Sequence, residues 1–330
     1  MKLTRRSFTA ALPMVAAARP AFAQSVTMQL TTTASNDYDV EWLELLKKKV
    51  EADSKGKIRA NVYPGSQLGS GPTTVEGVAL GTIEVAMNAS GTYEGVEPRA
   101  AILSVPGLFD TMAQGQKLLT SPEVRARLDK LGRDKGFQVL TVMAQSPAAI
   151  VTRRPLKTLA DMKGMKIRVP GSALLIEQLK QMGAAPIAMS LGEVLPAFQN
   201  GTIDGVYAGT TIFTALKYYD ISKNMTLLPR SFLVMLGIIN SDFLSTLGPL
   251  ANTVLDAARQ VDAESQAWAA QDVANAEKLW QANGGQVFTL SDADAKQYLD
   301  VAVPVAVKFL TPAARADYEV LKAAAAKLSL

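Results

Sequence analysis

One arginine stands where it could hold an anion. Residues 159–172 predict a short buried strand at 166–169, which carries Arg168 into a turn at Pro170 and Gly171. A guanidinium is permanently charged, and its paired N–H donors match the two oxygens of a carboxylate. An arginine at an arbitrary position more commonly forms a structural ion pair with a neighbouring acid. The strand-end position favours a ligand instead, so Arg168 is the leading candidate for carboxylate binding.

Other polar side chains follow predicted strands at the same kind of position. Small polar groups at strand ends orient ligands in otherwise apolar sites, although each of these residues could equally cap a turn. Asp37 and Tyr38 lie in the first strand-to-helix loop, where helix capping is favoured over ligand contact. The candidates for ligand binding at strand ends are Asn88, Ser90, Tyr93, Gln145, Thr210 and Thr211.

The chain has no cysteine and no histidine, which removes several kinds of chemistry. A disulfide, a thiolate nucleophile and a Ser-His-Asp triad are impossible, and zinc, copper or haem would lack their usual ligands. No Walker loop, Gly-x-Gly-x-x-Gly or Gly-x-Ser-x-Gly pattern occurs. Catalysis would have to rest on carboxylates, lysine, tyrosine or serine, and we expect neither a cofactor nor a metal site.

Residues 1–23 have the pattern of a cleaved twin-arginine export signal. They combine the motif RRSF at 5–8 with an alanine-rich apolar stretch and an Ala-x-Ala cleavage site at 21–23. The formal net charge of +4 for the whole chain equals the four basic residues of this segment, Lys2, Arg5, Arg6 and Arg19. The mature chain is therefore neutral, with no basic footprint for nucleic acid or anionic membranes. Because no later apolar run is long enough for a membrane span, we expect an exported, periplasmic protein.

The order of predicted elements is that of an α/β fold. Strand patterns at 26–31, 57–63 and 84–88 alternate with helix patterns at 38–54 and 73–80, which is repeated β-α-β wiring. In such folds ligands bind in the crevice at the carboxyl ends of the strands. The second half repeats this wiring with strands at 138–143, 150–152, 166–169, 187–189, 205–209 and 232–240 and helices at 173–182 and 192–200.

Two features bear on domain organisation. No low-complexity linker interrupts the chain, so we expect it to cross between two domains several times on strands. A helix pattern runs from Pro249 to about Asn283, and at 1.5 Å per residue it spans about 50 Å, enough to lie across both domains. A helix broken near residues 269–270 is the alternative.

The chain resembles the solute-binding proteins of tripartite ATP-independent periplasmic (TRAP) transporters, of the dicarboxylate-binding (DctP) type. The resemblance extends over nearly the whole mature sequence, and its specificity lies in the order and spacing of motifs that are individually loose. These motifs are GKI at 56–58, YPGSQLG at 63–69, ALGTIE at 79–84, PGLF at 106–109, the segment 161–172, MGAAP at 182–186, GEV at 192–194 and AFQNGTIDG at 197–205.

The resemblance implies a two-domain periplasmic-binding-protein fold, with the ligand cleft between the domains and the long helix spanning both. Domain I would comprise residues 24–146 plus about 234–273, and domain II residues 147–233 plus about 274–330. Such a protein closes around a small organic anion, delivers it to sodium-driven membrane permease subunits, and is not itself an enzyme. The family's carboxylate-binding arginine falls on Arg168.

Two positions depart from the family and bear on the ligand. Tyr207 stands where an asparagine is common, and it could give a hydroxyl or an aromatic wall, or simply belong to the core. Leu191 stands where many members stack a phenylalanine over the ligand, so the wall there should be aliphatic. Few charged residues other than Arg168 lie near the strand ends. We therefore favour a monocarboxylate or 2-oxo acid with an apolar body over a sugar acid rich in hydroxyls.

Two other classes of function remain as alternatives. A sensory binding protein, which presents its closed form to a membrane receptor, would have the same fold and the same arginine. A pull-down of the membrane partner would separate the two. A periplasmic lyase or hydrolase would need two carboxyl groups of divergent pKa facing one pocket, and the sequence offers no such constellation.

Overall fold

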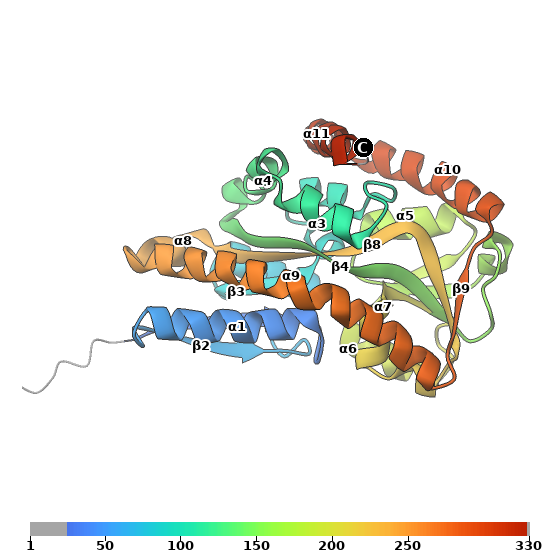
Figure 1. Cartoon of the computed structure of the whole chain (residues 1–330), viewed down its shortest axis with the longest axis horizontal. Helices are drawn as coiled ribbons and strands as arrows, with labels where there is room; N and C mark the ends of the chain where they lie inside the picture. Colours follow the sequence, from blue (N-terminus) through green and yellow to red (C-terminus); the bar gives the residue numbers. More distant parts are fainter. Residues whose placement is uncertain (1–24, 329–330) are drawn as a thin grey trace, which may run out of the picture.

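The computed structural model describes residues 25–328 apart from the side chains of 266–268, so the predicted export signal lies outside the described residues. Within them, nine strands form one mixed sheet in the order β2-β1-β3-β8-β4-β7-β5-β6, with β9 beside β8 (Figure 1). This mixed sheet with its many helices confirms the α/β class.

The N-terminal half of the sheet has the predicted β-α-β wiring. β1 (Val26–Thr32) lies between β2 (Ile58–Tyr63) and β3 (Val85–Ala89) and runs parallel to both. The connecting helices are α1 (Tyr38–Asp53) and α2 (Gly71–Leu80). Parallel strands leave their carboxyl ends at one edge, which is where a ligand can be reached from all three.

β8 (Asn224–Asn240) is the central strand, and its continuous apolar run is buried on both faces as predicted. Its side chains alternate between two cores because successive residues of a strand point to opposite faces. Leu236 and Ile238 join the core that includes residues of α3 and α11, whereas Met235 and Ile239 join the core under α1 and α9. The sheet is therefore covered by helices on both sides.

β4 (Phe137–Thr152) runs antiparallel to β8, and these two long strands connect the halves of the sheet. The sequence predicts separate strands at 138–143 and 150–152, and this is wrong, because β4 continues through both with shifts of register. One shift of register lies at Pro147. Proline has no N–H to donate to the neighbouring strand, and it interrupts the residue pattern that predicts a strand. The predicted domain boundaries at 146–147 and 233–234 fall within β4 and β8 and stay predictions.

The C-terminal half of the sheet repeats the parallel wiring. β5 (Lys166–Val169) lies between β6 (Ala185–Ala188) and β7 (Gly205–Gly209) and is parallel to both. The predicted strand at 187–189 begins two residues earlier in the structure. The helices of this half are α5 (Ala173–Gln181), α6 (Leu191–Gln199) and α7 (Thr210–Ala215).

The other elements cover the sheet and connect its parts. Among the described residues, no helix is both long enough and apolar enough to cross a membrane. The remaining helices and strand are α3 (Met112–Thr120), α4 (Pro122–Leu128), α8 (Ser241–Thr246), β9 (Gln286–Thr289), α10 (Asp292–Phe309) and α11 (Pro312–Leu328), and the 3-10 turns are η1 (Ser90–Tyr93), η2 (Pro98–Ser104), η3 (Arg133–Lys135), η4 (Leu159–Met162) and η5 (Tyr218–Asp220).

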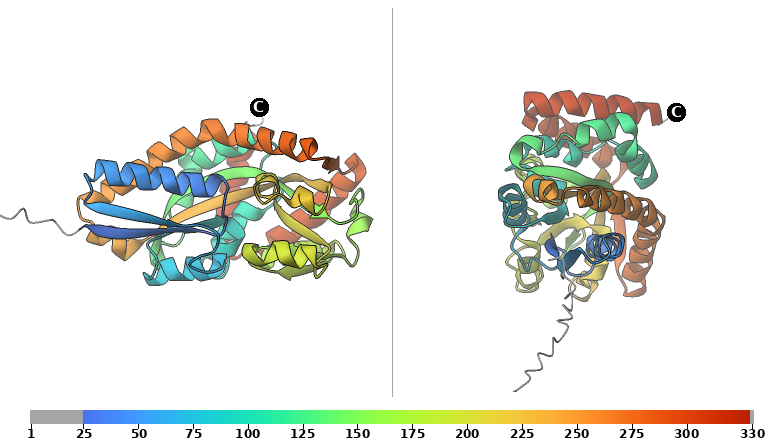
Figure 2. Two further views of the ribbon diagram at one scale, coloured as in Figure 1. Left: turned by 90° about the horizontal axis from the view of Figure 1, so that it is seen from below. Right: turned by 90° about the vertical axis from the view of Figure 1, so that its left-hand side faces the viewer.

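α9 (Leu250–Ala282) is one continuous helix of 33 residues, so the alternative of a break near 269–270 is wrong. It begins beside α1 and extends past α7 to β9, and thus lies across both halves of the sheet (Figures 1 and 2). Near its far end, Trp280 is fully buried against Phe213 and Tyr219. The helix therefore spans the molecule as predicted.

Asp262 is a partly buried acid where α9 faces α1 and β4. Its Oδ1 accepts hydrogen bonds from Trp42 Nε1 at 2.9 Å and from Thr141 Oγ1 at 2.6 Å. Burial raises the pKa of Asp262 to about 6, and these hydrogen bonds offset only part of that effect.

We predict that Asp262→Asn gains stability relative to the unmodified protein as the pH rises. A carboxyl with a raised folded-state pKa holds its proton more tightly when folded, so stability falls between the unfolded pKa, about 4, and the folded pKa, about 6. The difference in unfolding free energy should move by about 3 kcal/mol in favour of the variant over this range and then level off. Urea unfolding at a series of pH values measures it, and a constant difference would contradict the raised pKa.

Candidate functional site

A cavity of about 320 Å³ lies at the carboxyl ends of the parallel strands, where the two halves of the sheet meet. Ala89 lines it at the end of β3, and Thr33, Pro170 and Met189 line it directly after β1, β5 and β6. This is the position that the β-α-β wiring predicts. Much of the wall is apolar, including Ala34, Pro72, Leu191, Ile212, Leu233 and Met235.

Local signals in the sequence place Arg168 in this wall. Thr158 and Asp161 form a reciprocal capping box around η4, and Gly164, with φ of 72°, makes the left-handed turn before β5. β5 then pairs Arg168 with Ile187 of β6 and Val206 of β7. The strand is thus fixed on both edges, and its last residues enter the cavity.

Arg168 is nearly fully buried, with 5% of its surface exposed, yet it has no acidic partner among the described residues. Its Nε donates to the carbonyl of Met189 at 2.9 Å, and its Nη1 donates to the carbonyl of Tyr207 at 3.3 Å. Burial lowers the pKa of Arg168 to about 10, so the group is still a cation at neutral pH. The ion-pair alternative for Arg168 therefore does not hold in this structure, and its remaining N–H donors find no acceptor in the part of the chain that the structure describes.

Three more of the predicted residues line the same cavity. They are Gln145 of β4, Leu191 at the start of α6 and Tyr207 of β7. Leu191 gives the aliphatic wall expected at that position. Tyr207 lines the cavity and its carbonyl orients Arg168, whereas its ring belongs to the core that contains Tyr298, the third of the roles the sequence left open.

The structure does not bring the other five predicted residues to the cavity wall. Asn88 donates to Thr74 Oγ1 at 3.0 Å, and Ser90 shares a hydrogen bond with Ser104 at 3.1 Å. Tyr93 donates to the carbonyl of Leu236. Thr210 and Thr211 are buried in the first turn of α7, where Thr211 donates to Asp37 Oδ2 at 3.2 Å.

Two acids beside the cavity have roles that the sequence did not indicate. Asp37 precedes α1, but its side chain makes no capping hydrogen bond, so the expected capping role is wrong. Its Oδ2 instead accepts from Gln145 Nε2 at 2.7 Å, and burial raises the pKa of Asp37 well above its usual value. Asp39 lines the cavity and accepts a hydrogen bond from Thr32, and burial raises its pKa to about 6. Both shifts are upward, because burial disfavours the charged form of each carboxyl group.

The two halves of the sheet also meet beside the cavity. Glu94, which follows η1, accepts from Ser172 Oγ at 2.7 Å and from the Leu174 amide at 3.1 Å, at the N-terminus of α5. Gly171 lies so close to Pro72 that an added Cβ would stand 2.8 Å from its ring. The loop after β5 therefore packs directly against the first turn of α2.

The described residues contain no cluster of three or more acidic side chains that could hold a metal ion. A single guanidinium in an apolar cavity is instead suited to a small carboxylate. A family model described as bacterial extracellular solute-binding protein, family 7, matches residues 30–311. The chain belongs to this family. The resemblance to TRAP solute-binding proteins of the DctP type is thereby confirmed.

Curated relatives of this family protein differ in how much of their length is matched. The 2,3-diketo-L-gulonate-binding periplasmic protein YiaO of Escherichia coli (strain K12) is 30% identical over 200 residues, which cover 59% of this chain and 60% of that protein. A solute-binding protein of Verminephrobacter eiseniae is 27% identical over 309 residues, covering 92% of this chain and 90% of that protein.

Solved structures show the same fold. A TRAP periplasmic solute-binding protein from Desulfovibrio salexigens, with bound orotic acid, has a TM-score of 0.85 at 24% identity, covering 92% of this chain and all of that one (100%). One from Xanthobacter autotrophicus Py2, with bound β-D-galacturonate, has a TM-score of 0.83 at 25% identity, covering 90% and 99%. These likenesses confirm the two-domain binding-protein fold that the sequence predicts.

Proposed function

We propose that this family member captures a small organic acid in the periplasm by binding its carboxylate to Arg168, and delivers it to the membrane subunits of a TRAP transporter. One observation carries the proposal. A nearly fully buried guanidinium faces a cavity and has no acidic partner among the described residues. Such a charge is costly to bury alone, so a bound carboxylate stabilises the closed arrangement.

What the relatives bind agrees with an organic acid. Orotic acid and β-D-galacturonate are bound in the solved structures named above, and a further one from Shewanella oneidensis holds succinate. All three ligands carry a carboxylate, whereas the rest of each molecule differs. The apolar wall of this cavity favours a ligand with one carboxylate and a compact apolar body. A 2-oxo acid is the version that the sequence suggests.

Family membership supports transport rather than catalysis. Members of the matched family are named for solute binding. Delivery to a permease and export by the twin-arginine route are part of the proposal. A signal-sequence fusion to a reporter, with and without the pair Arg5 and Arg6, would test the export route.

Thermal shift against a panel of organic acids tests the ligand class. A ligand that binds only the folded protein raises its melting temperature by mass action. We expect Arg168→Ala to weaken binding at least about 30-fold, because a buried charge pair loses one partner. Arg168→Lys should also lose the ligand-induced rise in melting temperature, because lysine lacks the paired N–H donors.

The melting temperature of the unliganded protein separates binding from folding. Arg168→Ala removes an unpaired buried charge, so the unliganded variant should melt at the same temperature as the unmodified protein or higher. Arg259→Ala, an exposed arginine on α9, is the matched control and should keep the full ligand response. If a ligand raises the melting temperature of Arg168→Ala as much as that of the unmodified protein, Arg168 does not bind the ligand.

A further inference from the structure

Two residues of the cavity wall each retain a buried acceptor oxygen that has no hydrogen-bond partner among the described residues. The two atoms are Asp39 Oδ1 and Gln145 Oε1. Both side chains are almost completely buried, with 1% and 2% of their surface exposed. A buried acceptor that lacks a donor is costly, and such atoms in a folded protein call for an explanation.

The protein itself fixes these two groups as acceptors. The other carboxylate oxygen of Asp39, Oδ2, is occupied by Thr32 Oγ1. The amide nitrogen of Gln145 donates to Asp37 Oδ2, which leaves the carbonyl oxygen of the same amide without a donor.

The three unfilled groups of the wall come from different parts of the fold. Asp39 lies in the first turn of α1, Gln145 on the connecting strand β4, and Arg168 on β5. Arg168 offers donors and needs an acceptor, whereas Asp39 and Gln145 offer acceptors and need donors. The buried charges of the wall are therefore polarised, with Arg168 in one half of the molecule and Asp39 in the other, while the second acid of the wall, Glu193, is exposed and caps α6.

The chemistry of a solute group decides whether it can satisfy both acceptors. The oxygen of a 2-oxo acid is itself an acceptor, and a hydroxyl has one proton for two acceptors. A protonated amine has up to three N–H donors and also balances the charge of Asp39. A quaternary nitrogen has the charge but no N–H, so it leaves both oxygens unfilled.

The charges of the wall favour the same solute. Arg168 is the buried cation of the wall, and it stands against two buried acids, Asp39 in the wall and Asp37 behind Gln145, so a simple monocarboxylate would add negative charge without adding a cation. A zwitterion brings one charge of each sign and adds no net charge. Buried charges are tolerated when each has a partner.

We propose that the solute is a zwitterion, whose carboxylate binds Arg168 and whose N–H-bearing, positively charged nitrogen binds Asp39 and Gln145. This inference rests on the proposed function, because it assumes that Arg168 holds the carboxylate. It replaces the expected 2-oxo acid by an amino acid or another protonated amine with an apolar body.

Titration calorimetry with matched ligands tests the inference. The ligands are amino acids that carry the amino group at carbon 2, 3 or 4. Each is compared with three acids of the same carbon skeleton: the acid without nitrogen, the 2-oxo acid where one exists, and the N-trimethyl derivative. We expect the amino form of the best-fitting skeleton to bind at least about 30-fold more tightly than the nitrogen-free form. The N-trimethyl form should lose this advantage.

Variants locate the preference in the wall. Asp39→Asn should abolish the advantage of the amino form while the nitrogen-free acid binds as before or more tightly. Gln145→Met removes the second acceptor and leaves Asp39 in place, so it provides the same test if Asp39→Asn fails to fold. Asp262→Asn is the matched control, because this partly buried acid lies outside the cavity wall, and it should keep the preference.

The results separate this inference from the proposed function. If nitrogen-free or 2-oxo acids bind as tightly as their amino partners, and binding still requires Arg168, the zwitterion is excluded and the organic-acid function stands. Undiminished preference for the amino form in both Asp39→Asn and Gln145→Met would also exclude it. If no acid of either series binds, the proposed function fails and this inference fails with it.

Discussion

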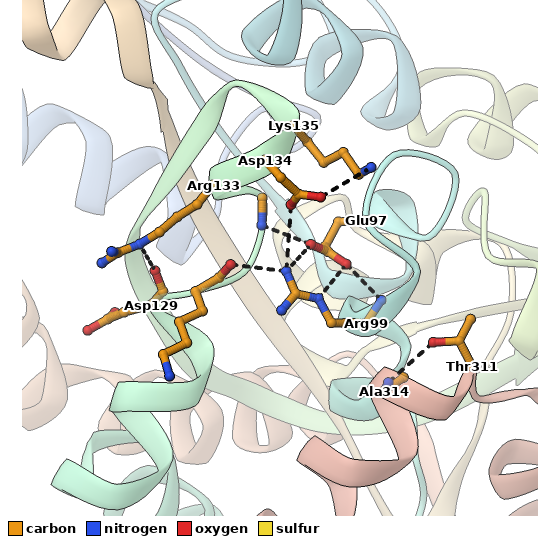
Figure 3. A network of polar contacts seen from close by, with 10 residues as sticks. Glu97, Arg99, Asp129, Arg133, Asp134, Lys135, Thr311 and Ala314 are labelled. Atoms are coloured by element: carbon orange, nitrogen blue, oxygen red, sulfur yellow. Dashed lines mark hydrogen bonds and ion pairs between the residues drawn. The ribbon is translucent and has the colours of Figure 1, made fainter.

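Replacing Glu97 with alanine is expected to lower the free energy of unfolding by about 2–3 kcal/mol, because it removes the buried acceptor of charge-assisted hydrogen bonds from a partly exposed arginine and from a backbone amide. Glu97 has 2% of its surface exposed and precedes η2. Its two carboxylate oxygens accept from Arg99 Nε at 3.0 Å and Nη2 at 2.6 Å (Figure 3). A third hydrogen bond, from the Gly132 amide at 2.9 Å, connects η2 to the turn before β4. The variant leaves all of these donors without their acceptor.

The pH dependence of this loss follows from the pKa of Glu97. Burial alone would raise that pKa, but the hydrogen bonds from Arg99 and Gly132 outweigh burial and hold it below its usual range. A carboxyl with a lowered folded-state pKa stabilises the protein above its unfolded pKa, and this stability is lost as the pH falls through the folded pKa. The difference between the unmodified protein and the variant should therefore shrink below about pH 4.

Urea unfolding at neutral and acidic pH measures both effects. Asp300→Ala is the matched control, since Asp300 pairs with Lys296 at 2.5 Å on the exposed face of α10. An exposed pair of this kind contributes less than about 1 kcal/mol. A loss in Glu97→Ala no larger than in this control would show that the network in Figure 3 does not stabilise the fold.

The position of Arg168 could be predicted because the signals that place it are local. The capping residues, the glycine turn, the short strand and the Pro-Gly turn all lie within residues 158–171. Each restricts the backbone of its neighbours, so their order fixes where the arginine leaves the strand. The long helix α9 was predictable for a similar reason, because nothing within it interrupts the helix pattern.

The strand-end rule failed for Asn88 because it ignored the pleat of the strand. Successive side chains of β3 point to opposite faces, so Ala89 lines the cavity while Asn88 turns toward Thr74 of α2. Sequence alone gives the end of a strand within a residue or two. An error of one residue in that end reverses which side chain meets the ligand.

Asp39 could not be assigned from sequence because its surroundings come from distant parts of the chain. The residues beside it include Asp37, which accepts hydrogen bonds from Gln145 and Thr211. These two residues lie 108 and 174 positions further along the chain. In the sequence, Asp39 cannot be told from the acidic residues that are common in the first turn of a helix. What distinguishes it is burial against a cavity, and burial is a property of the folded molecule.

The last prediction concerns two glycines with the same backbone conformation. Gly132 and Gly164 both have φ of 72°, a left-handed conformation that costs other residues about 1–2 kcal/mol. At Gly132 an added Cβ would stand 1.8 Å from the ring of Phe137, which is fully buried, whereas at Gly164 nothing lies within 4 Å. Gly132→Ala should therefore lower the free energy of unfolding by about 3–5 kcal/mol, the backbone cost plus that of overpacking. Gly164→Ala should lose only the backbone cost.

The comparison of these two variants isolates packing from backbone strain. Both substitutions add one methyl group at one backbone conformation, so the difference between their unfolding free energies, measured in urea, reports the contact with Phe137 alone. Phe137→Leu in the Gly132→Ala background should recover part of the loss, because a smaller side chain makes room for the methyl group. Equal losses in the two alanine variants would mean that the ring moves aside at little cost, and the turn before β4 would then be more adaptable than its burial indicates.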